Sequence, residues 1–363
     1  MRGDRMRLAR IGLGLSQQQL AAQVGVSRQA IAAIEAGLSD PSLKSAIALA
    51  RALGVGVEEL FSVAVRYPEV VATSLAPELT ASRADFSWVN GRAVALPLAG
   101  DHSLNVGFGA AGATISSSTA GSADSPSGQA SPRRLGDVAL NPNREVPPAL
   151  IIAGCDPALA LLPSIFANVD PRIGCLWWPA SNGEALDLLR RGLIHAAGFH
   201  VADGAPYPKV DAELFRFARW REGLAYRSES PTPAKIEQGL RLANRQPGSE
   251  ARHMVDEVLS ELGVSGEAVT GYDSALSAHA LVGSAIVSRV ADFGVTIEPV
   301  ALEFGLNFQA RATEDFVLAI PAGHISTPEI RALFRALTSQ ELRSQLGAIR
   351  GYLEVERSGE PMG

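Results

Sequence analysis

Residues 15–37, LSQQQLAAQVGVSRQAIAAIEAG, decide the fold of the N-terminal part of this 363-residue chain. Their spacing predicts two short helices that are joined by a tight turn. Ser16 and Ser27 precede the two helices, where a side-chain oxygen can accept a backbone N–H hydrogen bond. Gly25 lies at the turn and Gly37 ends the second helix, and both positions favour glycine for steric reasons. Apolar residues that recur three and four positions apart form the predicted inner face: Leu20, Ala21, Val24, Ala30, Ile31 and Ile34.

The outer face of the second helix predicts contact with DNA. The residues left on that face are Arg28, Gln29, Ala32, Ala33 and Glu35. An arginine can donate two hydrogen bonds to guanine O6 and N7, and a glutamine can bridge adenine N6 and N7. A helix whose first exposed residues are Arg and Gln is therefore suited to the major groove.

Residues 6–61 resemble the phage-repressor-type helix-turn-helix domain of bacterial regulators, the XRE family. The matching blocks are Leu15-Ser16-Gln17, Gly25-Val26-Ser27, Ile31 to Gly37 and Ile47 to Phe61. The resemblance implies that Gln17 contacts a phosphate and steadies the helix behind it, and that Arg28 and Gln29 contact bases. The alternative is a small helical bundle with no role on DNA. The predicted DNA-binding set is Gln17, Gln18, Ser27, Arg28, Gln29 and Ala32.

The charge of the chain is divided unevenly. Residues 1–66 contain eight Lys/Arg and five Asp/Glu, a net charge of +3, whereas the whole chain carries −6, which leaves −9 for the remainder. A weakly basic head on an acidic body fits a DNA-binding domain attached to a part that does not bind DNA. Because one such head neutralises few phosphates, we expect a homodimer or higher homo-oligomer on double-stranded operator DNA with two-fold symmetry.

Length and composition predict two or three domains with ample core, since 47% of the residues are hydrophobic. We find no N-terminal apolar signal segment and no apolar run near eighteen residues, so we expect a cytoplasmic protein without a membrane partner. The cysteines Cys155 and Cys175 form no disulfide framework and suit a reducing compartment. Neither has a His/Cys cluster close by in the sequence, so we predict structural thiols and no metal.

Residues 67–148 are predicted to form a small β-rich connector after the helix-turn-helix domain of residues 1–66. Short alternating runs in 88–115 and 134–142 indicate strands. Residues 116–132, SSSTAGSADSPSGQASP, predict a disordered loop. The pair Asp101–His102 is expected on the surface.

From residue 149 to 363 the pattern becomes α/β. The buried-strand runs PALIIAGC, GCLWWPA and IHAAGFHV alternate with helices, which predicts a parallel sheet. A second α/β unit follows residue 233, with strands expected at 239–243 and 268–274. Ligands bind beyond the carboxyl ends of the strands in such sheets. His195 and His200 are five residues apart on one strand, so at most one of them faces a cleft.

Residues 149–355 resemble the type-2 periplasmic-binding-protein fold, in the form that is fused to helix-turn-helix heads and is similar to molybdate-binding proteins. The matching blocks are Gly154 to Leu159, Ser181 to Gly183, Gly192 to His200, Asn244 to Arg252, Gly271-Tyr272, His279, Ala291 to Gly294 and Gly305 to Phe308. The resemblance implies two lobes that enclose a small molecule. The predicted ligand-binding set is Cys155, Asp156, Ser181, Asn182, His200, Asn244, Arg245, Ser249, Arg252, Tyr272 and His279.

One block departs from the family pattern. The turn Gly-Ser-Gly-Thr-Arg of the family is Gly248-Ser249-Glu250-Ala251-Arg252 in this chain. A carboxylate close to a bare oxyanion costs on the order of 1 kcal/mol or more at a partly exposed site. Two effector classes therefore stay open: an oxyanion such as molybdate or tungstate, if Glu250 points to solvent, or a small organic metabolite.

Together these patterns predict a one-component bacterial transcription regulator: an all-α head, a β-rich connector and an α/β two-lobed effector domain. We find no Gly-x-Ser-x-Gly, no phosphate-binding loop and no His-Glu-x-x-His, so we expect no enzyme activity and no certain cofactor beyond the effector. Two alternatives remain. The C-terminal domain could serve only for oligomerisation, or Cys155, at a helix start that lowers thiol pKa, could sense oxidants.

Overall fold

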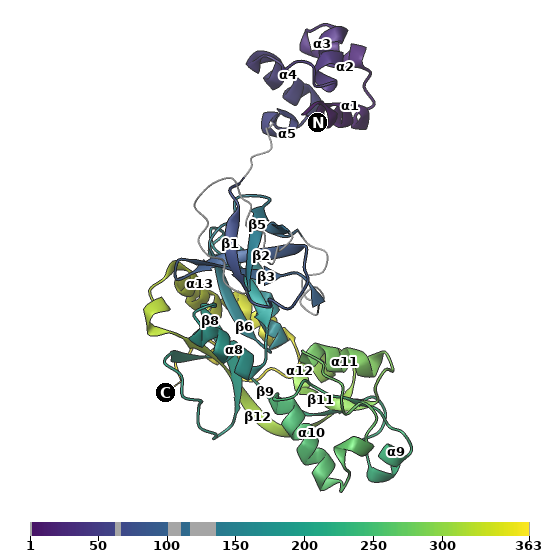
Figure 1. Cartoon of the computed structure of the whole chain (residues 1–363), viewed down its shortest axis with the longest axis vertical. Helices are drawn as coiled ribbons and strands as arrows, with labels where there is room; N and C mark the ends of the chain where they lie inside the picture. Colours follow the sequence, from purple (N-terminus) through teal and green to yellow (C-terminus); the bar gives the residue numbers. More distant parts are fainter. Residues whose placement is uncertain (1, 62–66, 101–109, 117–135, 363) are drawn as a thin grey trace. The chain divides into compact units, whose positions relative to one another are not determined.

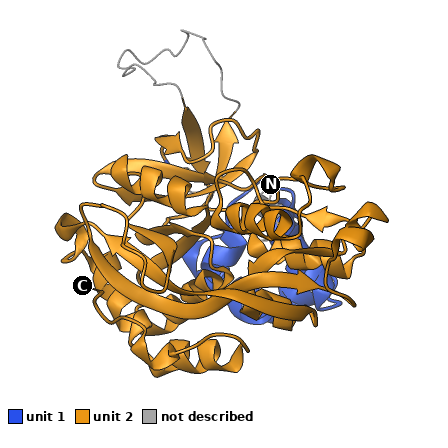
Figure 2. Ribbon diagram, turned by 90° about the horizontal axis from the view of Figure 1, so that it is seen from below, with its two compact units in different colours: residues 1–67 blue, residues 68–363 orange. Residues whose placement is uncertain are grey.

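The computed structural model describes residues 2–61, 67–100, 110–116 and 136–362. They form two compact units, residues 1–67 and residues 68–363 (Figure 1, Figure 2). Ser116, the first residue of the predicted loop at 116–132, ends a strand, and residues 117–132 and the pair Asp101–His102 lie outside the described residues. Within the described ranges, no helix is long and apolar enough to cross a membrane.

The N-terminal unit is a bundle of short helices. Ser16 accepts a hydrogen bond from the Gln19 backbone and the Gln19 side chain returns one, which makes a capping box. Ser27 accepts a hydrogen bond from the backbone of Ala30, and Gly25 adopts φ 72° between the two helices. The helices are α1 (Arg2–Gly12), α2 (Gln17–Val24), α3 (Arg28–Glu35), α4 (Leu43–Leu53) and α5 (Val57–Phe61). Their core contains Met6, Leu20, Ile31, Leu49 and Leu60.

The β-rich connector is a closed barrel with strand order β1-β3-β2-β4-β5. Its strands are β1 (Val70–Ser74), β2 (Arg83–Val89), β3 (Arg92–Pro97), β4 (Ala113–Ser116) and β5 (Asp137–Pro142). The interior is filled mainly by alanines around Phe86 and Leu140, which suits a narrow barrel. Val94 and Leu96 pack against the first lobe of the following domain, and the Ser87 hydroxyl donates to the carbonyl oxygen of Ala149. The barrel and the two-lobed domain therefore form one compact unit.

A seven-stranded mixed sheet with the order β10-β11-β9-β12-β8-β6-β7 follows. Its strands are β6 (Ala149–Gly154), β7 (Gly174–Pro179), β8 (Ala196–Ala202), β9 (Glu213–Tyr226), β10 (Leu242–Ala243), β11 (Phe293–Ile297) and β12 (Asn307–Ile320). β6 runs parallel to β7 and β8, but β9 and β12 are antiparallel to each other and to their other neighbours. The predicted parallel pairing of the three strands β6, β7 and β8 is confirmed, whereas the antiparallel pairing of β9 and β12 was not predicted.

Two lobes share the long strands β9 and β12, which run through both. In lobe 1, α7 (Leu162–Val169), α13 (Pro328–Leu337) and α14 (Gln340–Ala348) cover one face of the sheet, and α8 (Asn182–Arg190) and the barrel cover the other. In lobe 2, α10 (Glu250–Glu261) covers one face, and α11 (His279–Val287) and α12 (Glu298–Glu303) cover the other. Figure 1 shows α10, α11 and α12 around β11. The helix α9 (Pro233–Glu237) precedes β10.

Two predictions for lobe 2 need correction. The strand expected at 239–243 shrinks to Leu242–Ala243. Residues 268–274, expected as strand and turn, begin in a 3-10 helix and continue as turns. Gly271 explains the second case, because it adopts φ 91° and its backbone lies against the carbonyl of Leu242.

Candidate functional site

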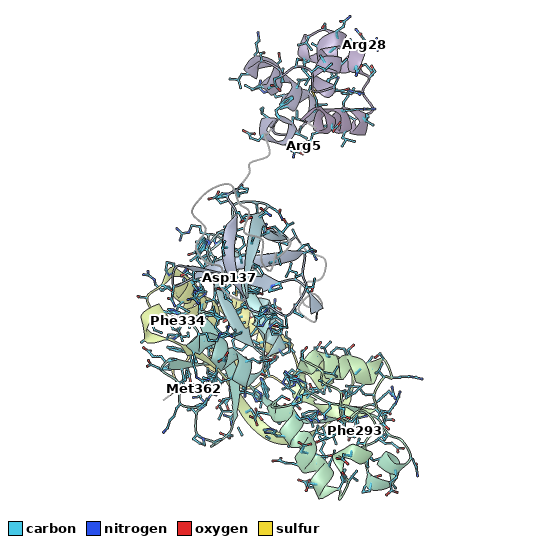
Figure 3. All side chains as sticks on the ribbon, in the orientation of Figure 1. Arg5, Arg28, Asp137, Phe293, Phe334 and Met362 are labelled. Carbon is cyan, nitrogen blue, oxygen red and sulfur yellow. The ribbon has the colours of Figure 1, made fainter. Side chains whose placement is uncertain are left out.

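The first candidate site is the outer face of α3 in the N-terminal unit. Arg28 and Gln29 are exposed at the start of the helix, and Figure 3 marks Arg28. Ser27 is exposed as the cap of α3, and Ala32 is half-buried one turn later. On α2, Gln18 is exposed. A short, capped helix that presents Arg and Gln at its free N-terminal end has the geometry of a major-groove reader.

Glu35 is not on the outer face, which corrects the sequence analysis. It is buried, and its carboxylate accepts a hydrogen bond from Arg10 Nε at 2.6 Å. Gln17 Nε2 also donates to Glu35, at 2.9 Å. Burial by itself would raise the pKa of Glu35, but the hydrogen bonds from Arg10 and Gln17 outweigh it and hold that pKa below its ordinary value. This ion pair connects α1 to α3.

The second candidate site is a cavity between the two lobes. Lobe 1 contributes residues that follow β6, begin α8 or lie in β8, and lobe 2 contributes residues that follow β10 or begin α10 and α11. The lining residues are Cys155, Ser181, Asn182, His200, Arg245, Ser249, Glu250, Ala251 and His279. The cavity volume is about 10 Å³, which is room for a single water-sized particle. Seven of the residues predicted from the sequence meet here.

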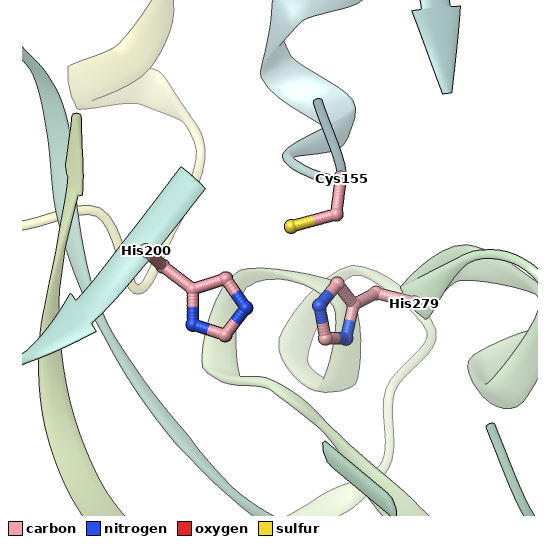
Figure 4. Close-up of side chains that lie close together, drawn as sticks. All are labelled: Cys155, His200 and His279. Carbon is pink, nitrogen blue, oxygen red and sulfur yellow. The ribbon is translucent and has the colours of Figure 1, made fainter. Parts of the chain in front are cut away.

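Cys155, His200 and His279 form a buried cluster at this cavity. One ligand atom of each lies within 4.8 Å of the others, and Figure 4 shows the Cys155 sulfur facing both imidazole rings. No histidine lies near Cys155 along the chain, as the sequence analysis stated, but the fold brings the distant His200 and His279 to it. Cys175 instead lies in the apolar core of lobe 1, where burial raises the pKa of its thiol.

Sequence analysis missed two glutamates that stand beside this cluster. Glu314 in β12 makes a very short contact with His200 Nδ1. Glu222 in β9 is fully buried, and neither of its oxygens has a hydrogen-bond partner among the described residues. Glu222 Oε1 lies 4.0 Å from His279 Nδ1, and that nitrogen is also unpartnered within the described part of the chain. The sequence signal was weak, because each glutamate stands beside another charged residue in its long strand: Glu222 follows Arg221, and Glu314 precedes Asp315.

The cluster shifts the pKa values of its members in different directions. Burial lowers the pKa of His200, but its contacts with Cys155 and Glu314 outweigh burial and raise it well above the ordinary value. Burial, and then the charge of Glu314, raises the pKa of Glu222 to about 8. Burial, and then the positive charges of Arg245 and His200, lower the pKa of His279 well below its usual range. Titratable groups with opposite tendencies are thus concentrated among buried residues.

Asp156 and Asn244, both predicted to bind ligand, are turned into the fold. Asp156 is fully buried; it caps the 3-10 helix after β6 and accepts hydrogen bonds from Trp220 Nε1 and the Tyr352 hydroxyl. The Asn244 amide donates to the carbonyl of Tyr272 at 2.9 Å. Their polar atoms hold loops in place and do not line the cavity.

Arg252 and Tyr272 also lie outside the cavity lining. The Arg252 guanidinium stacks on the Tyr272 ring at 4.2 Å, and the Tyr272 hydroxyl donates to Asp256. The side chain of Glu250, which lines the cavity, is 53% exposed, so its carboxylate is largely solvated. His195 lies away from the cavity, where its Nδ1 accepts the Ile151 N–H at 2.9 Å.

Comparisons with known proteins agree with both parts of the fold. A helix-turn-helix family model matches residues 6–60, and a model of the PBP superfamily domain matches residues 164–338. An HTH-type transcriptional regulator of Methanocaldococcus jannaschii is 53% identical over 47 residues, which are 13% of this chain and 71% of that protein. The chain belongs to the helix-turn-helix family of transcriptional regulators, and its C-terminal part carries a domain of the PBP superfamily.

Two further matches have lower sequence identity. The protein YvgK of Bacillus subtilis is 27% identical over 121 residues, which are 33% of this chain and 38% of YvgK. The solved structure of a putative phosphate ABC transporter substrate-binding protein from Clostridium perfringens, with bound phosphate, aligns with a TM-score of 0.43 and 10% identity. That alignment covers 56% of this chain and 98% of the other.

Proposed function

We propose that this chain is a cytoplasmic one-component transcription regulator that binds operator DNA as a dimer and senses a small molecule between its lobes. One observation carries the proposal. The same chain exposes Arg28 and Gln29 at the free start of α3 and encloses a cavity lined from both lobes of a PBP-type domain. The proposal assigns no catalytic step to the chain.

On the DNA side, Arg28 and Gln29 contact bases and the neighbouring residues contact the backbone. Gln17 has two N–H donors on its amide, and one of them is used by Glu35. The other is free to donate to a phosphate while the first fixes the side chain. Gln18, Ser27 and Ala32 complete the contact surface around α3.

On the effector side, closure of the lobes couples binding to operator affinity. A ligand that contacts both lobes has a higher affinity for the closed state, and only such a difference can shift the balance between states. The proposed contacts are Cys155, Ser181, Asn182, His200, Arg245, Ser249 and His279. A molybdate-sized anion or a metabolite exceeds the volume of about 10 Å³, so the lobes must separate to admit one.

A thiol sensor is the second candidate, because the Cys155 sulfur faces the imidazole rings of His200 and His279 (Figure 4). It predicts that Cys155→Ser abolishes a response of operator binding to peroxide. A response that survives in Cys155→Ser rejects the thiol sensor.

The test uses the full chain and an operator selected from random duplexes. Arg28→Ala/Gln29→Ala removes two bidentate base contacts, each with about 1–3 kcal/mol of discrimination. We therefore expect specific affinity to fall by a factor of at least about 30, with binding to random DNA largely retained. Arg331→Ala is the control, because it removes an exposed arginine from the other unit. Unchanged operator occupancy in the double variant would refute the proposal.

A further inference from the structure

We propose that Cys155, His200 and His279 bind a divalent transition-metal ion of the zinc class, and that this ion is the effector. The effector role rests on the proposed function, whereas the metal site itself does not. The proposal starts from the donor set: a thiol and two imidazoles, all buried, with ligand atoms within 4.8 Å of one another. Thiolate and imidazole are the ligands that Zn²⁺ and related ions select, and Mg²⁺ and Ca²⁺ avoid.

His200 has the surroundings of a metal ligand. Its Nδ1 contacts the Glu314 carboxylate, which fixes the orientation of the ring and leaves Nε2 on the side of the Cys155 sulfur (Figure 4). Histidines that bind metals usually donate their other ring N–H to a carboxylate or carbonyl in this way. Glu314 therefore serves as a positioning residue for His200.

The carboxylate oxygens of Glu222, unpartnered within the described residues, favour a cation beside the cluster. Glu222 has no exposed surface and no hydrogen-bond partner for either oxygen in the described ranges, a condition that costs free energy unless an ion or proton compensates it. The approach of His279 Nδ1 to Glu222 Oε1, at 4.0 Å, brings this carboxylate next to the cluster. Glu222 can therefore supply compensating charge beside His279, as Glu314 does beside His200.

The polar groups around the cluster include two acids and an arginine. Glu222 and Glu314 are buried carboxyl groups, and Arg245 is a buried guanidinium. The Arg245 guanidinium is held by the carbonyls of Leu276 and Ser277. A divalent cation at the cluster favours the ionised forms of both carboxyl groups. An oxyanion at the same point would face two buried carboxylates, which disfavours it.

The position of the ligands explains how an ion acts on the lobes. Cys155 and His200 belong to lobe 1, and His279 begins α11 in lobe 2. Donor atoms in a tetrahedral zinc site are roughly 3.5 Å apart, from the usual Zn–S and Zn–N bond lengths. An ion would hold donors that all lie within 4.8 Å of one another at this spacing, by contraction of the site where they are farther apart. Contraction pulls His279 toward lobe 1, and a cavity of about 10 Å³ suits a monatomic ligand.

The binding test uses the untagged full chain after removal of metal by a chelator, with a phosphine reductant. Zn²⁺ is titrated by calorimetry, and Co²⁺ by absorbance, because a thiolate ligand gives a sulfur-to-cobalt charge-transfer band. We expect one ion per chain, no competition by Mg²⁺, and a rise in thermal midpoint with zinc concentration. No zinc binding, or equal competition by Mg²⁺, overturns the site.

Matched variants assign the ligands. Cys155→Ser and His279→Gln should each weaken zinc binding at least tenfold, and Cys155→Ser should remove the charge-transfer band. Cys175→Ser and His253→Gln are controls, because Cys175 lies in the core of lobe 1 and His253 is exposed. The thermal midpoint in chelator shows whether each variant is folded. A charge-transfer band that persists in folded Cys155→Ser overturns the site.

Operator binding then separates the two proposals. We expect zinc to change the operator affinity of the native chain at least fivefold, and to leave that of Cys155→Ser unchanged. If zinc binds through these residues but operator affinity is constant, the effector role is overturned. If zinc does not bind while Arg28→Ala/Gln29→Ala still abolishes operator binding, the metal inference fails and the DNA-binding function stands.

Discussion

At the scale of single residues, His195 makes the fold of the C-terminal unit sensitive to acid. Its ring is buried, and its Nδ1 accepts the Ile151 N–H at the start of the parallel strands. Burial lowers the pKa of His195 from 6.5 to about 4. The folded state therefore keeps this ring neutral over a pH range in which the unfolded chain protonates it.

We predict that this group reduces the free energy of unfolding as pH falls. Its contribution is complete above pH 6.5 and is lost progressively as pH falls toward 4, because the unfolded state binds the extra proton. The loss amounts to roughly 3 kcal/mol over that window. His195→Asn keeps an acceptor near the position of Nδ1 and cannot titrate. The slope of the free energy of unfolding against pH reports the number of protons taken up on unfolding, and we expect this number to fall by up to about one in the variant.

Urea unfolding followed by tryptophan fluorescence measures this prediction, because all four tryptophans lie in the C-terminal unit. The control is His253→Asn, whose ring is largely exposed and whose pH profile should match the native chain. An unchanged slope in His195→Asn would show that the ring is not kept neutral.

Residue patterns predicted individual site residues better than their partners. Cys155, His200 and His279 were each identified as ligand candidates, but their clustering needed the sheet order, which no local pattern contains. The burial of Glu35 also depends on a partner that is distant along the chain. Its place on α3 indicated exposure, and the guanidinium of Arg10, from a different helix, draws it inside. Long-range ion pairs reverse predictions that rest on helical periodicity alone.

At the scale of elements, the antiparallel pairing of β9 and β12 joins the two lobes. Gly223 pairs with Ala310 just before a register shift at Ala310/Ala312, and Glu222 pairs beyond it with Ala312. A Cβ on Gly223 would lie 2.2 Å from the carbonyl oxygen of Gln309. Only glycine allows the two backbones to approach this closely at the junction.

Gly223→Ala should therefore destabilise the C-terminal unit by about 1–3 kcal/mol, since the clash is with backbone that cannot turn away. The lower midpoint would be measured in urea by tryptophan fluorescence. Gly183→Ala is the matched control, because nothing lies within 4 Å of its new Cβ in α8, and it should be neutral or slightly stabilising. Equal midpoints for the two variants would contradict the close approach.

The elements that were predicted well are those whose start and end are determined by residues within or next to the element. The caps Ser16 and Ser27 and the turn at Gly25 define α2 and α3 locally. β9 was missed because its sequence ELFRFARWREGLAY places arginines among apolar residues. The structure pairs Arg216 and Arg219 with Asp315 of β12. Such cross-strand ion pairs cannot be predicted before the strand partner is known. The antiparallel pairing of β9 with β12 could not be predicted for the same reason.

At the scale of the whole molecule, charge separates the DNA-binding head from the acidic remainder. Residues 1–66 carry +3 and the other residues carry −9, the difference from the total of −6. The acidic part repels a phosphate backbone, so the favourable ionic contacts must come from the heads. A single head of this charge releases few counterions, and its affinity depends weakly on salt.

We predict that two chains occupy one operator. The ionic contacts of the second chain should then steepen the dependence of binding affinity on salt concentration. The slope of log affinity against log salt is about −0.9 per phosphate neutralised, so a two-fold operator should give about twice the slope of a duplex that carries one half-site. Fluorescence anisotropy over a salt series measures the slopes, and sedimentation of the complex gives the number of chains bound. The Arg331→Ala variant should keep both slopes, because the exposed Arg331 belongs to the other unit. Equal slopes on the two duplexes, with one chain per operator, would mean that a single head makes all the ionic contacts and that the dimer has no part in DNA binding.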